Sequence, residues 1–72
     1  MFEQQDRLIS RLVEKLNDTD PIIRRNAAGA LRLHGCRAVI ALPALTQLLE
    51  DEDSRVRNEA ERAVIRLRAS AA

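Results

Sequence analysis

The chain has 72 residues, of which 46% are hydrophobic and 32% carry a charge. This composition is too apolar for a disordered chain and too charged for a membrane protein, and no apolar run approaches the about 18 residues that a membrane span needs. The 12 basic and 11 acidic residues leave a net charge of +1, so the total charge indicates no class of partner. One cysteine, Cys36, excludes a disulfide within the chain and favours a reducing, cytoplasmic setting.

The first half of the chain predicts two helices. Apolar residues recur at helical spacing over about residues 3–17, which predicts a first helix. The second helix is expected to run from Pro21 to about His34, because the Asp20 carboxylate can cap free N–H groups and proline is tolerated in the first helical turn. The inward positions expected for this helix are Ile23, Ala27, Ala30, Leu31 and His34.

The second half predicts two more helices. The third is expected over about residues 38–50, and Pro43 inside it predicts a kink, because an interior proline removes a backbone hydrogen bond. The fourth is expected to run from Ser54 to about residue 69, with Asp53 as its cap. The inward positions expected for this helix are Val56, Ala60, Ala63, Val64 and Leu67.

The two halves repeat each other. Setting Asp20 against Asp53 gives an offset of 53 − 20 = 33 residues. A fixed period of this size predicts stacked helical hairpins: an all-α solenoid of four helices in a single domain over residues 1–72, with a first repeat over about 3–35 and a second over about 38–69. The pairs matched by this offset include Leu12 with Leu45, Leu16 with Leu49, Asp18 with Asp51, Ile23 with Val56, Arg24 with Arg57, Ala27 with Ala60, Ala30 with Ala63 and Leu31 with Val64.

The pattern L-P-A-L-x-x-L-L-x-D-x-D-x-x-V-R-x-x-A-x-x-A-V, from Leu42 to Val64, resembles a HEAT repeat. The period of 33 is shorter than the about 40–47 residues usual for this family, and is similar to the short HEAT-like units of bilin lyase subunits. The resemblance implies a right-handed solenoid twist. It also implies that the turn aspartate and the helix arginine of each unit bridge neighbouring repeats, a structural role that falls here on Asp18, Arg24, Asp51 and Arg57.

No residues are predicted to carry catalysis or to hold a metal or cofactor. His34 and Cys36 lie two residues apart, but a metal site needs three or four ligands and a cysteine nucleophile paired with histidine needs a third, orienting group. The acidic run over residues 50–53 lacks the spacing and central glycine of a calcium-binding loop. We therefore expect a protein that is not an enzyme.

Four arginines are expected to share one face of the second and fourth helices, opposite their apolar stripes. In HEAT proteins these helices line the concave side, where partners dock, so the resemblance implies that this face binds. Arginine pairs with carboxylate or phosphate through two hydrogen bonds, and we expect an acidic segment of a protein partner. The expected binding residues are Arg25, Arg32, Arg55, Asn58, Arg62 and Ile65, with Glu59 and Glu61 on the flanks.

Three alternatives to this hypothesis stay open. The resemblance to bilin lyase subunits suggests an accessory role in such an enzyme, although the chain lacks aromatic residues for a chromophore cleft. Binding to the nucleic-acid backbone is disfavoured by the small net charge and the missing aromatics. The face could also be an ordinary solvated surface.

Two repeats are few, because stacked units bury their cores against neighbours and about three are normally needed. The chain begins with Met and ends in a plain alanine tail, which favours a complete small protein over a piece of a longer solenoid. The shortage of core disfavours a bare four-helix monomer. We therefore expect a homo-oligomer formed by end stacking.

Overall fold

The computed structural model describes the backbone of residues 2–71 and the side chains of residues 7–71. All regular structure in this range is helical, and none of its helices is long and apolar enough to cross a membrane. The elements are α1 (Phe2–Lys15), α2 (Pro21–His34), the 3₁₀ helix η1 (Gly35–Ala41), α3 (Leu42–Gln47), the 3₁₀ helix η2 (Leu48–Glu50) and α4 (Ser54–Ala71).

The expectation of four continuous helices is wrong for the third, so the described chain has three long α-helices. Residues 38–50 form one end of η1, the six residues of α3, and η2. Pro43 explains the change, because it has no N–H to bond the carbonyl of Val39 and its ring crowds that carbonyl. The segment before it tightens to 3₁₀ geometry, and Pro43 lies in the first turn of α3, where a missing N–H costs nothing.

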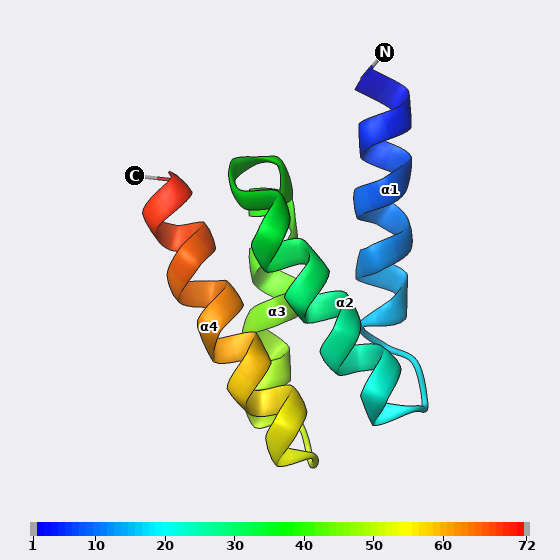
Figure 1. The fold of residues 1–72 in the computed structure, drawn as a ribbon, viewed down its shortest axis with the longest axis vertical. Helices are drawn as coiled ribbons and strands as arrows, with labels where there is room; N and C mark the ends of the chain where they lie inside the picture. Colours follow the sequence, from blue (N-terminus) through cyan, green and yellow to red (C-terminus); the bar gives the residue numbers. More distant parts are fainter. Residues whose placement is uncertain (1, 72) are drawn as a thin grey trace.

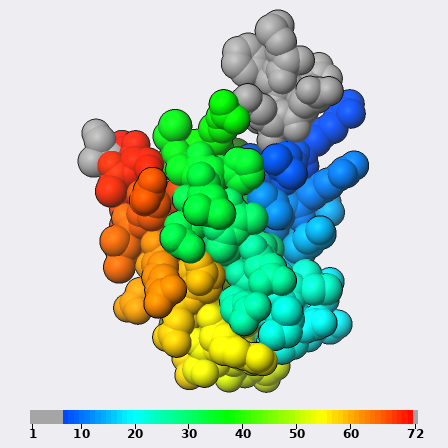
Figure 2. All heavy atoms as spheres, viewed as in Figure 1, coloured from blue at the N-terminus to red at the C-terminus, as the bar shows by residue number. Residues whose placement is uncertain are grey.

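The helices are arranged as two antiparallel pairs (Figure 1). Helix α1 packs antiparallel to α2, and α3 packs antiparallel to α4. Helices α2 and α4 run side by side in the same direction and share the most extensive contact in the molecule. In the space-filling view, α2 lies between α1 and α4 on the face turned to the viewer (Figure 2).

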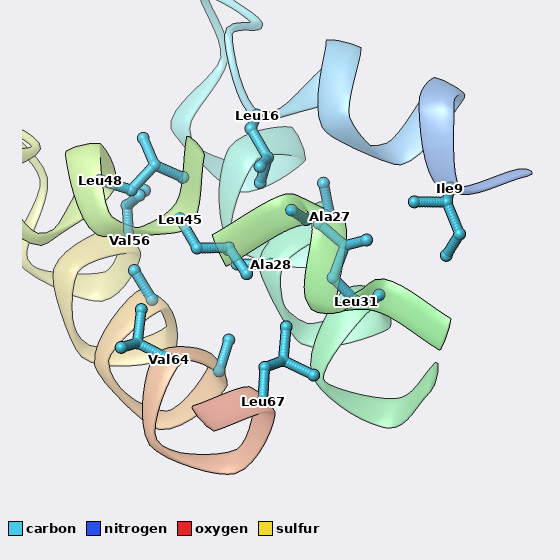
Figure 3. Close-up of a cluster of buried hydrophobic side chains, with 14 residues drawn as sticks. Ile9, Leu16, Ala27, Ala28, Leu31, Leu45, Leu48, Val56, Val64 and Leu67 are labelled. Atoms are coloured by element: carbon cyan, nitrogen blue, oxygen red, sulfur yellow. The ribbon is translucent and has the colours of Figure 1, made fainter. Parts of the chain in front are cut away.

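The core lies between α2, α4 and the interrupted segment η1–α3–η2 (Figure 3). Leu31, Leu45 and Leu67 are completely buried and point toward one another from three different elements. Ile9 of α1 belongs to the same core, and so does Leu16, which directly follows that helix. Alanines fill the remaining core positions, so the backbones approach closely with little side-chain volume between them. The buried alanines are Ala27, Ala28, Ala38, Ala41, Ala60 and Ala63.

The inward face predicted for α4 is confirmed, whereas that of α2 is partly wrong. All five predicted positions of α4 are buried, but Ile23 is 36% exposed and Ala30 and His34 are only partly buried. Instead, α2 buries Arg24 and Ala28 along a second stripe. The two helices differ because of their neighbours. The side of α4 that carries Val56 packs against the first repeat and is buried, whereas the described chain has no repeat to pack against the corresponding side of α2, which carries Ile23.

Candidate functional site

The two turns that precede α2 and α4 are built alike. In the first, an Asp18 carboxylate oxygen accepts a hydrogen bond from the backbone N–H of Asp20 at 2.8 Å, and in the second Asp51 accepts one from Asp53 at 2.9 Å. The next aspartate of each turn caps the helix that follows. Asp20 accepts a hydrogen bond from the backbone N–H of Ile22, and Asp53 accepts one from the backbone N–H of Arg55, both at 2.8 Å. The predicted caps are therefore confirmed, and the 33-residue repeat extends to hydrogen-bond geometry.

Arg24 joins the two turns. Its Nε and Nη2 donate to the two carboxylate oxygens of Asp51 at 2.9 and 3.0 Å, a bidentate ion pair between the first and second repeats. Its Nη1 donates to the carbonyl oxygens of Asp18 and Thr19, at 2.7 and 3.1 Å. The side chains of Arg24 and Asp51 are each only 8% exposed, so the bridge is shielded from water, and none of the buried polar side-chain atoms in the described residues lacks a hydrogen-bond partner.

The electrostatics of this bridge keep both partners ionised. The hydrogen bond to Asp51 raises the pKa of the Arg24 guanidinium, although burial acts in the opposite direction. Burial alone would raise the pKa of Asp51, but the hydrogen bonds from Arg24 and from the Asp53 backbone outweigh it and hold that pKa below its ordinary value. The ion pair therefore persists at every pH at which an ordinary aspartate is charged.

The same bridge has no counterpart at the ends of the molecule. Arg57, which matches Arg24, donates from Nη1 to the carbonyl oxygen of Asp51 at 2.6 Å, as Arg24 does in its own turn. Among the described side chains, no carboxylate pairs with Arg57 and no basic group pairs with the carboxylate of Asp18. Of the four residues expected to bridge repeats, only Arg24 and Asp51 form an ion pair from one repeat to the other.

The four arginines expected to form a binding face differ in availability. Arg32 donates to Glu59 at 2.9 Å, and Arg55 pairs with Asp53 at 2.8 Å, which raises the pKa of the Arg55 guanidinium. Arg62 lies 4.0 Å from Glu59 with a side chain that is 71% exposed. The partner of Arg25 is a neutral amide. Arg25 and Arg62 are therefore the members whose charge is least neutralised.

The structure also divides the predicted face into separate grooves. Arg25 and Arg32 line a shallow groove over α2 that Glu59 of α4 closes on one side. Asn58 and Ile65 line another groove along α4, together with Arg57 and other residues. Arg62 lines neither of these two grooves and lies 4.0 Å from Glu59, and Arg55 pairs with Asp53 at the acidic turn.

Glu59 is a contact that the sequence analysis missed. It was expected on a flank of the fourth helix, but it reaches across to α2 and pairs with Arg32. Gly29 leaves room for it, since a Cβ on that residue would stand 3.3 Å from the Glu59 carboxylate. The sequence separation could have indicated this contact. Arg32 and Glu59 are 27 residues apart, which is also the separation of Arg24 and Asp51 in the bridge.

The two residues with potential nucleophilic or metal chemistry stay apart from these surfaces. Cys36 is an exposed free thiol in η1, and His34 at the end of α2 is partly buried. Within the described part of the chain, no group of three His, Cys, Asp or Glu side chains is arranged to hold a metal ion.

Two helical hairpins with the same turn geometry, joined by an ion pair, define a helical-repeat protein. The family model for HEAT repeats matches residues 6–72, and the chain therefore belongs to the HEAT repeat family. The search of curated proteins and the search of solved structures each gave no match. The resemblance seen in the sequence is thus confirmed at the level of the family.

Proposed function

We propose that this protein is a non-enzymatic interaction module that binds an acidic segment of a protein partner through the exposed arginines of α2 and α4. HEAT repeats commonly serve as protein-interaction scaffolds and are generally non-enzymatic. In this proposal the hairpins stack with the right-handed twist of a solenoid, and α2 and α4 form its concave layer.

The observation that carries the proposal is the separation of charge along α2 and α4. Both helices begin at acidic turns and run in the same direction, so their C-terminal halves lie at the same end of the molecule (Figure 1). Residues 21–49 contain no acidic residue, and neither does α4 after Glu61. This end therefore carries basic groups with few carboxylates to neutralise them. Its exposed or partly exposed arginines are Arg32, Arg37, Arg62, Arg66 and Arg68, and Arg25 lies nearer the turn.

This distribution favours an acidic peptide over an uncharged one. Arg25 lines the groove that Glu59 closes, and Arg62 lies 4.0 Å from the same Glu59. Successive carboxylates of an acidic peptide can pair with these two arginines while Glu59 keeps Arg32 in place. Such contacts at an exposed surface set specificity and association rate more than affinity. We therefore expect weak, salt-sensitive binding.

The test is the fluorescence anisotropy of a labelled polyglutamate peptide titrated with the protein. The double substitution Arg25→Glu with Arg62→Glu should weaken binding by about tenfold or more, because like charges then face the peptide. The matched control is Arg7→Glu with Arg11→Glu on α1, which changes the net charge by the same amount and should weaken binding much less. Equal weakening by both pairs, or no binding by the unmodified protein, contradicts the proposal.

Duplex DNA is the second probe in the same titration. A backbone binder releases counterions from many phosphates, so its affinity would fall steeply with salt. We expect the peptide to bind and the DNA not to bind near physiological salt. Tight, steeply salt-dependent DNA binding would instead assign the arginines to nucleic acid.

A further inference from the structure

The two repeats contribute different residues to the contact between them. Each end of the molecule carries residues that match one side of this contact. Across the contact, α2 contributes Arg24, Ala28 and Arg32, whereas the second repeat contributes Asp51 and Glu59. The residues 33 positions after those contributed by α2 lie on α4, at the C-terminal end of the stack. The residues 33 positions before those contributed by the second repeat lie on the first repeat, at the other end. We call these surfaces the trailing end (Arg57, Glu61, Ile65) and the leading end (Lys15, Asp18, Ile23, Asn26).

The trailing end is an open groove. Arg57, Glu61 and Ile65 match Arg24, Ala28 and Arg32, and all three line a groove along α4 together with Leu49 and Val64. Ile65 is 65% exposed. Arg57 already holds the position over its own turn that Arg24 holds, with its Nη1 bonded to a turn carbonyl at 2.6 Å. Arg57 is therefore held at this end in the way that Arg24 is held on the face that α2 presents to the second repeat.

The leading end is the matching hollow. Lys15, Ile23 and Asn26 match Leu48, Val56 and Glu59, and they line a depression between α1 and α2 together with Leu12 and Ala30. Ile23 is 36% exposed, although its match Val56 is completely buried between the repeats. Asp18, the match of Asp51, follows Lys15 closely, since its backbone N–H donates to the Lys15 carbonyl oxygen at 3.1 Å, and no described basic group pairs with its carboxylate.

We propose that the trailing end of one copy of this chain docks on the leading end of a second copy, with an Arg57–Asp18 ion pair that repeats the internal Arg24–Asp51 bridge. Charge complementarity supports a second copy as the occupant. The buried positions Ala28 and Leu48 correspond to Glu61 on the trailing end and Lys15 on the leading end. With Arg57 and Asp18, each end therefore offers one positive and one negative group, and each group has an opposite charge at a matching position of the other end. Ile65 and Ile23 supply the apolar area.

The contact is head-to-tail, and its two surfaces differ, so it does not close on itself as a twofold dimer does. A copy that has docked still presents a free trailing or leading end. The assembly therefore grows with concentration instead of stopping at two chains. It weakens with added salt, because salt screens the attraction between exposed charges such as Lys15 and Glu61 on the two ends.

The test reverses the charge at one end at a time. Arg57→Asp and Asp18→Arg each place like charges at the contact and should weaken self-association by about tenfold or more. Mixing the two variants restores opposite charges at both kinds of contact, so the mixture should associate although each variant alone does not. Sedimentation velocity measures the mass, and circular dichroism establishes that each variant is helical.

A second pair of variants covers the case in which a turn substitution prevents folding, since Asp18 and Arg57 also bond within their own turns. Lys15→Glu and Glu61→Lys change exposed side chains outside the turns, and they should show the same loss and the same recovery on mixing. Recovery in either mixture supports the head-to-tail contact. An unmodified protein that stays monomeric, a mass that stops at a dimer, or folded variants whose mixture does not associate would overturn it.

Discussion

The interface between the repeats and the two outer ends of the molecule are built from the same residue pattern with opposite outcomes. Inside, Arg24 and Asp51 form a bidentate bridge, and Val56 is completely buried. At the ends, the matching Arg57, Asp18 and Ile23 meet no second repeat, and Ile23 stays 36% exposed. A repeat thus specifies surfaces that are complementary to its own copy, and burial depends on whether a neighbour is present.

The largest effect is expected when a residue of the interface between the repeats is replaced by the residue at the matching position of the outer end. Ala28 is completely buried, whereas its match is Glu61, which is exposed. Ala28→Glu forces a carboxylate into a completely buried position, and the neighbouring Arg24 and Arg32 already pair with Asp51 and Glu59. The cost should be several kcal/mol, which is comparable to the about 5 kcal/mol of total stability of a small domain. We expect most of this variant to be unfolded by circular dichroism at 25 °C.

The control is the reverse exchange at the end. Glu61→Ala removes an exposed charge and should change the free energy of unfolding by no more than about 0.5 kcal/mol. Equal stability of the two variants would show that the two matched positions do not differ in environment.

A second exchange compares apolar positions. Val56→Ala deletes two buried methyl groups between the repeats and should cost about 2 kcal/mol, through lost transfer free energy and the cavity that remains. Ile23→Ala deletes more carbon from a surface that is already partly hydrated and should cost less than about 1 kcal/mol. Urea unfolding of both variants measures the difference, and a larger loss for Ile23→Ala would contradict the assignment of interface and end.

The third prediction concerns the bridge in acid. The folded protein holds the pKa of Asp51 below its ordinary value, so the bridge contributes stability that is fully present above about pH 4 and is lost as the pH falls further. Asp51→Asn should reduce the proton uptake on acid unfolding by at most about one proton, measured from the pH dependence of urea unfolding. Some acid dependence should remain, because the Arg55 side chain also lowers the pKa of Asp53.

The matched background for this prediction is Arg24→Gln. In that background the Asp51 carboxylate has lost its main partner, so adding Asp51→Asn should change the acid response much less than it does in the unmodified protein. Equal effects of Asp51→Asn in both backgrounds would mean that the bridge does not control the acid response.

The sequence predicts the long helices well because their signals are local. Pro21 and the two capping aspartates define where α2 and α4 begin, and Gly35 ends α2 with a backbone φ of 62° that favours glycine. The offset of 33 residues likewise predicted which residues share a position in each hairpin. The family followed from these positions.

The features that escaped prediction depend on neighbours rather than on local sequence. Pro43 was expected to kink a helix, but it displaced the start of α3 and converted the preceding residues to 3₁₀ geometry. Glu59 has a helical position typical of a solvated flank, and only the approach of α2 at Gly29 makes it a partner of Arg32. The arginine face was divided for the same reason, since helical periodicity says nothing of where an adjacent helix lies.

We propose that each repeat presents two complementary surfaces and that the two outer surfaces bind those of a second copy. The most direct measurement is the sedimentation-velocity mass of the unmodified protein over a series of concentrations, with reductant present because the Cys36 thiol is exposed. The weight-average mass should rise continuously above the 8.1 kDa of one chain as the concentration increases. A mass of 8.1 kDa at every concentration would contradict the proposed binding between copies.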